Sequence, residues 1–102
     1  MEALKESYKR HGLSYILIKR NDLLSIYGVS GTYTEKIIHY EVIMIRIRND
    51  QYGHREVIPS DEEFGRTKAD RHFKKLAEAE EYFAFWTSNL MQEVKEKVEK
   101  VV

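Results

Sequence analysis

The stretch EKIIHYEVIMIRIR, residues 35–48, decides the fold of this chain. It is rich in β-branched residues and contains neither Gly nor Pro, a composition typical of β-strands. Successive side chains of a strand point to opposite faces, and here both faces are largely apolar over the middle of the stretch. We therefore predict a central strand covered on both sides, and Arg46 and Arg48 mark the place where one face meets water.

Weaker strand signals precede this stretch. Residues 14–20 and 23–27 are rich in aromatic and β-branched side chains. Asn21-Asp22 between them favours a tight turn, because both residue types tolerate left-handed backbone. Residues 28–31 are predicted as a loop. The segment Glu2–Arg10 is predicted as a short helix, which the following Gly would cap.

A shorter strand follows the central one. It covers residues 54–58, after a turn at residues 49–53. The strand ends before Pro59, which has no N–H to donate to a ladder. Together these elements predict an antiparallel β-meander of three or four strands.

A long amphipathic helix is predicted from about Lys75 to Lys100. Apolar residues recur there at steps of three, four and seven, which is the spacing of one helical face. For residues 66–73 the pattern is compatible either with the start of the helix or with a last strand. The apolar stripe consists of Ala69, Phe73, Leu76, Phe83, Trp86, Leu90, Val94, Val98 and Val101.

Composition limits the classes of protein to consider. The 102 residues fit one domain, and 42% of them are apolar. Seventeen Lys and Arg balance seventeen Asp and Glu, whereas nucleic-acid-binding proteins usually show a basic excess. The chain has no Cys, no apolar signal core near its first residue and no run of the ~20 apolar residues that span a bilayer. We predict a cytoplasmic location and no membrane partner.

The predicted helix is long for so small a domain. About 26 residues make a helix of about 39 Å, whereas a domain of about 100 residues has a radius of gyration of about 13 Å. Residues 90–102 are therefore predicted as a helical extension that associates with another copy or with a different protein; a solvated tail is the alternative. The predicted partner-binding residues are Tyr82, Phe85, Val94, Val98 and Val101.

Basic and aromatic residues alternate along the predicted strands. Such side chains on a sheet can neutralise and stack on single-stranded nucleic acid. A nucleic-acid-binding accessory protein is thus an alternative function, although tyrosine is also a routine strand former. The residues that would carry this function are Lys19, Arg20, Arg46, Arg48 and Arg55, with Tyr15, Tyr27, Tyr40 and Tyr52 among them.

Groups capable of acid–base chemistry or metal binding are present without a recognised motif. His39 and Glu41 would point to one face of the central strand. The acidic loop at residues 61–63 has His54, Asp70 and His72 near it in the sequence, and their spacing matches no established metal motif. A small enzyme or ligand binder around His39, Glu41 and this loop is a further alternative. We predict no catalytic residue, no metal ligand and no cofactor.

One set of short motifs resembles a known group. Tyr40-Glu41-Val42, the loop Pro59-Ser60-Asp61-Glu62-Glu63-Phe64-Gly65 and the later Tyr82-Phe83 lie within residues 40–83. This pattern resembles small uncharacterised proteins encoded by phages and mobile elements. The resemblance implies such an origin, and it implies no activity and no site residues.

These observations predict a single α+β domain over residues 1–102, in which an antiparallel β-meander of three or four strands is packed by a long C-terminal helix. The predicted function is that of a small non-enzymatic protein-interaction module that associates with itself or with another protein.

Overall fold

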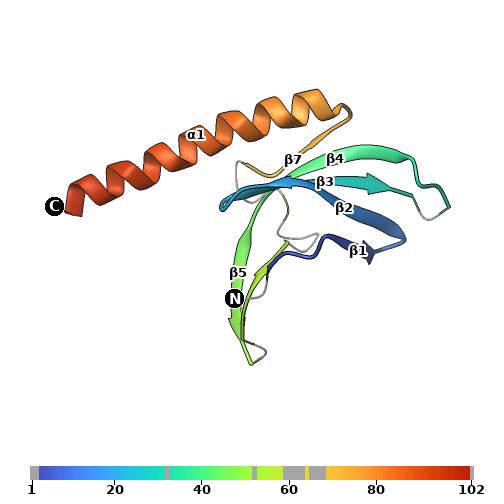
Figure 1. Ribbon diagram of the computed structural model, residues 1–102, viewed down its shortest axis with the longest axis horizontal. Coiled ribbons are helices and arrows are strands. Elements are labelled where there is room, and N and C mark those ends of the chain that lie inside the picture. The colour runs from blue at the N-terminus through green and yellow to red at the C-terminus, as the bar shows by residue number, and fades with distance from the viewer. Residues whose placement is uncertain (1–2, 32, 52, 59–63, 65–68, 102) are drawn as a thin grey trace.

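The computed structural model describes residues 3–31, 33–51, 53–58, 64 and 69–101, with Asp50 and residues 94–101 described by their backbone alone (Figure 1). The strand pairings in this part of the chain are antiparallel, and one long helix follows them. The predicted α+β class is confirmed. The elements are β1 (Ser7–Arg10), β2 (Leu13–Arg20), β3 (Leu24–Ser30), β4 (Ile37–Met44), β5 (Arg46–Asp50), β6 (Gly53–Val57), β7 (Arg71–Phe73) and α1 (Leu76–Val101).

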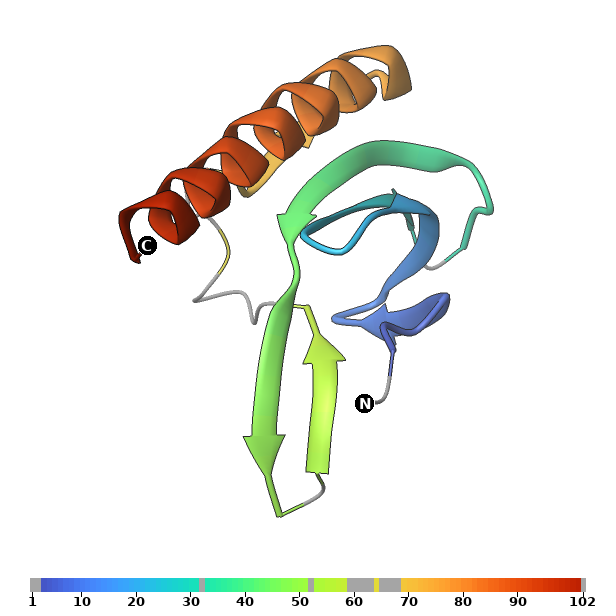
Figure 2. The same ribbon diagram turned by 60° about the vertical axis from the view of Figure 1, so that its left-hand side comes forward.

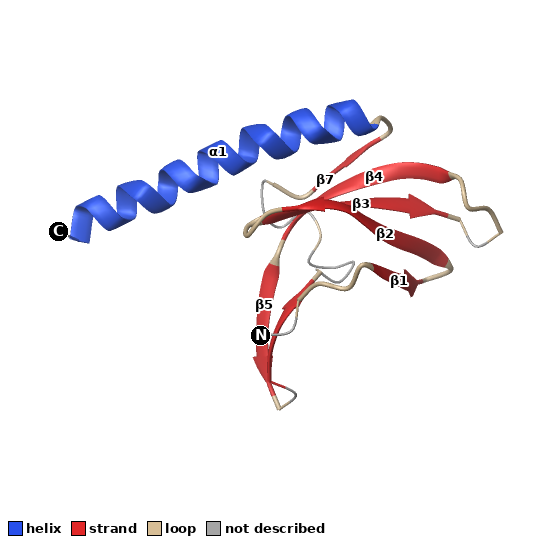
Figure 3. Ribbon diagram, in the orientation of Figure 1, coloured by secondary structure: helices blue, strands red, loops and turns tan. Residues whose placement is uncertain are grey.

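Five strands form the main sheet, in the order β1-β2-β3-β4-β7, and β5 pairs with β6 in a separate hairpin. The helix lies across one face of the sheet, and the hairpin projects from the other side (Figure 3). The structure adds β1 and β7, at the two edges of the sheet, to the strands that the sequence predicts. Of the residues 66–73, for which helix and strand were both compatible with the sequence, 69–73 are described, and residues 71–73 form β7.

The predicted N-terminal helix is wrong for the residues described. Ser7–Arg10 pair with β2 through a two-residue turn, in which His11 and Gly12 have φ of 51° and 75°. Positive φ at both central residues is the geometry that suits a tight hairpin. The ring of Tyr8 stacks on the ring of Tyr15 at 4.5 Å. Strand pairing and this ring contact outweigh a short helix, which is marginal without packing.

The predicted loop at residues 28–31 is also wrong, because β3 continues to Ser30. A Cβ on Gly28 would lie 2.8 Å from Ile37 Cδ1 and 2.9 Å from Ile18 Cδ1. The glycine therefore allows two isoleucine side chains to approach the strand closely, and it does not mark a turn.

The predicted central strand is divided at Ile45. β4 ends at Met44 in the main sheet, and β5 begins at Arg46 in the hairpin. Asp70 holds this junction: its carboxylate accepts a hydrogen bond of 3.0 Å from the Met44 backbone N–H and pairs with the Arg46 guanidinium. The backbone N–H of Ile45 donates a hydrogen bond of 2.9 Å to the carbonyl of Leu23, one position beyond the last β3–β4 pair.

The sheet is covered on both faces, as predicted for its central strand. On the α1 side, the buried core consists of Leu24, Ile26, Val42, Ala69, Ala79 and Phe83. On the opposite side, the second core consists of Tyr15, Tyr27, Val29 and Ile43, with Phe64 and Ile58 packed against it. The faces of β4 alternate as expected, with Val42 toward the helix and Ile43 away from it.

The helix agrees with the prediction in its bounds. Phe83 and Trp86 pack on the sheet, and Thr87 Oγ1 accepts a hydrogen bond of 2.8 Å from Asn21 Nδ2 in the β2–β3 turn. α1 contacts β3, β4 and β7. Its last turns project past the sheet, as Figures 1 and 2 show from two directions. Among the described residues, no helix combines the length and apolarity needed to cross a membrane.

Candidate functional site

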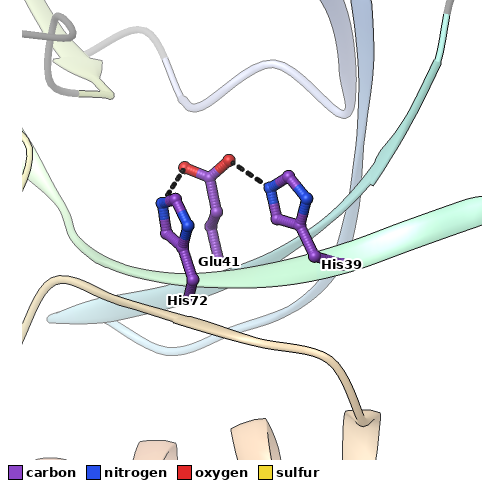
Figure 4. Close-up of side chains that lie close together, drawn as sticks. All are labelled: His39, Glu41 and His72. Atoms are coloured by element: carbon purple, nitrogen blue, oxygen red, sulfur yellow. Dashed lines mark hydrogen bonds and ion pairs between the residues drawn. The ribbon is translucent and has the colours of Figure 1, made fainter.

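His39, Glu41 and His72, three residues of types that can bind a metal ion, converge on the face of the sheet opposite α1. The His39 Nε2 atom lies 3.1 Å from Glu41 Oε2, and the His72 Nε2 atom lies 4.0 Å from Glu41 Oε1. Figure 4 shows the carboxylate between the two imidazoles, with each ring directing a nitrogen toward it. One ligand atom from each residue can be chosen so that all three lie within 4.8 Å of one another.

The positions of these side chains follow from strand register. His39 and Glu41 are two residues apart in β4, so they share a face. His72 in β7 is directly opposite Glu41 in the antiparallel pairing. Its neighbours Arg71 and Phe73 point the other way, toward α1, where both approach the ring of Tyr82. The pairing of β4 with β7 is therefore the step that assembles the cluster.

The cluster has a buried centre and an open side. The side chain of Glu41 is 8% exposed, whereas that of His72 is 57% exposed. The two imidazole rings stack with centroids 5.0 Å apart, and the ring of Phe64 lies 4.8 Å from that of His72. A carboxylate buried to this extent needs a positive or hydrogen-bonding partner, and His39 Nε2 lies within hydrogen-bond distance of it.

The sequence predicts only part of this cluster. His39 and Glu41 were expected on one face, and they are. His72 was grouped instead with the acidic loop at residues 61–63, which lies outside the described residues. His54 lies in β6, in the hairpin, and Asp70 pairs with Arg46. The signal that would have identified His72 was the β7 strand, which has only three residues and weak strand propensity.

The basic residues proposed for nucleic-acid binding do not form one free surface. The guanidinium of Arg20 binds the carboxylate of Glu56 through two hydrogen bonds of 2.6 and 2.8 Å. This bidentate pair lowers the pKa of Glu56 and raises that of Arg20. Arg46 pairs with the buried Asp70, and Lys19 lies over the ring of Phe83 at 5.3 Å.

The remaining members of that set lie on the hairpin. Arg48 in β5 and Arg55 in β6 are directly opposite each other, and both line a cavity of about 280 Å³ between the hairpin and the N-terminal segment. Tyr27 also lines this cavity, and its hydroxyl donates a hydrogen bond of 2.9 Å to the Lys5 carbonyl.

The tyrosines expected to stack on bases are occupied within the protein. Tyr15 and Tyr27 are buried in the second core, where burial raises the pKa of Tyr27 to about 12. Tyr40 packs against the core on the α1 side. Tyr52 lies outside the described residues. The described strands thus offer few free rings for stacking.

The predicted partner-binding residues differ in exposure. Tyr82 is half-buried, with its ring 5.0 Å from that of Phe73, so it widens the buried face of α1. Phe85 and Met91 are 61% and 62% exposed. The helix reaches Val101, so positions 94, 98 and 101 are helical, but their side chains lie outside the description.

Comparisons with known proteins identify no relative. No family model matches the chain, and neither the curated proteins nor the solved structures contain a match. The resemblance to phage-encoded and mobile-element-encoded proteins therefore stays a prediction.

Proposed function

We propose that the chain is a small non-enzymatic protein-interaction module that associates with a second copy of itself through α1. The observation that carries this proposal is a mismatch between helix and sheet. α1 has 26 residues, which corresponds to about 39 Å, and its contacts are with β3, β4 and β7. The last turns extend beyond the sheet (Figure 2).

The sequence of the projecting segment supports an apolar contact. Phe83 and Leu90 pack on the core, and Val94, Val98 and Val101 continue the same helical spacing. An apolar stripe that extends beyond the sheet it packs on gains free energy by packing against another apolar surface, since burial of each methylene contributes about 0.8 kcal/mol.

A surface of that kind lies on the same molecule. α1 packs on β3, β4 and β7, and it meets β2 at Lys19, whose ammonium lies 5.3 Å from the ring of Phe83. Tyr15 and Leu17 of β2 pack in the second core, so Ile16 between them is on the α1 side of the sheet. Ile18 lies where the β2–β3 register shifts, and its Cδ1 reaches the same side, because a Cβ on Gly28 would lie 2.9 Å from it. Ile16 is 48% exposed and Ile18 is 37% exposed. The uncovered part of the face therefore carries large apolar side chains.

A two-fold dimer would cover both apolar surfaces, the end of α1 and the exposed side of β2, at the same time. In such a dimer each contact occurs twice, because the same pair of patches meets in both directions. The projecting segment of α1 from one copy would cover β2 of the other copy. The two patches then stabilise the dimer together.

Sedimentation velocity over a range of protein concentrations tests the proposal. The full chain is expected to form a dimer. Two variants should each be monomeric: the triple substitution Val94→Gln, Val98→Gln and Val101→Gln, and the double substitution Ile16→Thr and Ile18→Thr. The matched control replaces three polar residues on the opposite side of the helix from the stripe in the sequence pattern, Gln92→Ala, Glu96→Ala and Glu99→Ala, and should remain dimeric.

Two results would contradict the proposal. A full chain that stays monomeric at every concentration removes self-association. A β2 variant that dimerises as well as the full chain, while the valine variant does not, shows that the helix meets a surface other than β2.

A further inference from the structure

The cluster of His39, Glu41 and His72 has a composition that the interaction function does not use. Two imidazole nitrogens and one carboxylate oxygen are the donor set found in several zinc sites and in facial sites for other first-row metals. Imidazole suits Zn²⁺, Co²⁺ and Ni²⁺, whereas Mg²⁺ and Ca²⁺ prefer oxygen ligands alone. The donor types thus select transition metals over the hard cations.

The distances in the cluster are close to those that one ion requires. Two ligands at about 2.1 Å from a tetrahedral ion are about 3.4 Å apart. His39 Nε2 lies 3.1 Å from Glu41 Oε2, and His72 Nε2 lies 4.0 Å from the other oxygen, Oε1; one ligand atom from each residue can be chosen so that all three lie within 4.8 Å of one another. The longer separation involves His72, whose side chain is mostly exposed, so a small rotation of that ring brings its nitrogen into range.

Burial and backbone also favour a site. Glu41 and His39 are fixed on β4, between its pairings with β3 and β7, so two of the three ligands are positioned before an ion binds. The low exposure of Glu41 strengthens the attraction between its carboxylate and a cation. The exposed side of His72 gives an ion a route from solvent.

We infer that His39, Glu41 and His72 bind one divalent transition-metal ion, with Zn²⁺, Co²⁺ and Ni²⁺ as the ions that fit. The two histidines bind through Nε2 and Glu41 through a carboxylate oxygen. Three protein ligands leave a fourth position for water on the exposed side, as in zinc sites that keep one coordination position open. The ion would also tie β7 to β4, because His72 is the middle residue of a three-residue strand.

Titration calorimetry with ZnCl₂ tests this site on the full chain without an affinity tag. One ion per chain is expected to bind. His72→Gln and His39→Gln should each weaken Zn²⁺ binding by more than about 10-fold, since even the loss of an outer-shell partner costs that much in metal sites. Zn²⁺ should raise the melting temperature of the unmodified chain, because an ion that binds only the folded state stabilises it, and Mg²⁺ should not.

The matched control is His54→Gln, which removes an exposed histidine in β6 and should leave Zn²⁺ binding unchanged. Circular dichroism of each variant before titration establishes that it is folded. Of the two histidine substitutions, the one at His72 is expected to disturb the fold least, because its side chain is exposed. Absence of Zn²⁺ binding at millimolar concentration overturns the inference. Equal affinity in His72→Gln and the unmodified chain does so as well, since the ion would then sit elsewhere.

Discussion

Replacing Asp70 with Asn is expected to destabilise the fold by about 3–4 kcal/mol, in the lower part of the range of about 3–5 kcal/mol for a broken buried ion pair. The side chain of Asp70 is 0% exposed and that of Arg46 is 19% exposed. The substitution keeps the shape of the side chain and removes its charge, so the Arg46 guanidinium loses its ion pair with position 70. Partial exposure of Arg46 lets water replace some of the lost interaction, which is why the upper part of the range does not apply.

The same substitution also weakens the junction between β4 and β5. Asp70 Oδ1 accepts the Met44 backbone N–H at 3.0 Å, and an amide oxygen accepts that bond less strongly than a carboxylate. The two effects act at the one place where the chain leaves the main sheet for the hairpin. We therefore expect the hairpin to detach more readily, in addition to the loss of global stability.

Urea unfolding followed by circular dichroism measures the effect, and a double-mutant cycle isolates the pair. Asp70→Asn, Arg46→Met and the double variant should show a coupling free energy of about 1–3 kcal/mol, because the two side chains are in contact. Asp22→Asn, at an exposed turn position, is the control and should change stability by less than about 0.5 kcal/mol. Additive effects of the two single variants would refute the reasoning, as would a cost below about 1 kcal/mol for Asp70→Asn.

Three further outcomes are expected. The pKa of Glu56 is lowered by Arg20, so the pair contributes stability above the ordinary glutamate pKa of about 4.3, and this contribution is lost as the pH falls through the lower pKa of the folded state. In acid unfolding curves, the free energy of unfolding of Glu56→Gln should therefore fall less steeply with decreasing pH than that of the unmodified chain. Phe83→Ala should cost about 3–5 kcal/mol in urea unfolding, whereas Phe85→Ala, at an exposed position, should cost about 0.5 kcal/mol or less in the monomer. Gly28→Ala should lower the free energy of unfolding by about 1 kcal/mol, because the new methyl meets only the ends of two isoleucine side chains. A melting temperature lower by 15 °C or more corresponds to about 2–4 kcal/mol for a domain of this size and would contradict that expectation.

Two of the three residues of the candidate metal site could be placed together from the sequence, and the third could not. Alternation along β4 placed His39 and Glu41 on one face, and the structure agrees. His72 is 31 positions beyond Glu41 in the sequence, and only the β4–β7 pairing brings the two together. A three-residue strand carries too little local signal to predict that pairing, because its backbone hydrogen bonds are made with a distant segment.

The interaction residues divide in the same way. Helical spacing alone identified Phe83 as buried, and the structure places it in the core. The same spacing could not separate Tyr82 from Phe85, because both lie off the centre of the stripe. The sheet decided between them: β7 brings Phe73 against Tyr82, while nothing among the described residues covers Phe85 to the same extent.

The sequence by itself determined the long helix, the apolar character of both faces of β4 and the turn at Asn21-Asp22, whereas residues 49, 50 and 53 of the turn predicted at 49–53 belong to the paired strands β5 and β6. These features depend on periodicity and residue type within a few positions, so local information is enough. Only the tertiary structure decided that β1 is a strand, that β4 ends at Met44 and that His72 meets Glu41. The end of β4 and the approach of His72 to Glu41 rest on interactions between segments far apart in the chain, which no local pattern records. β1 is a strand because its pairing with the neighbouring β2 and the ring contacts of Tyr8 outweigh a local helical pattern.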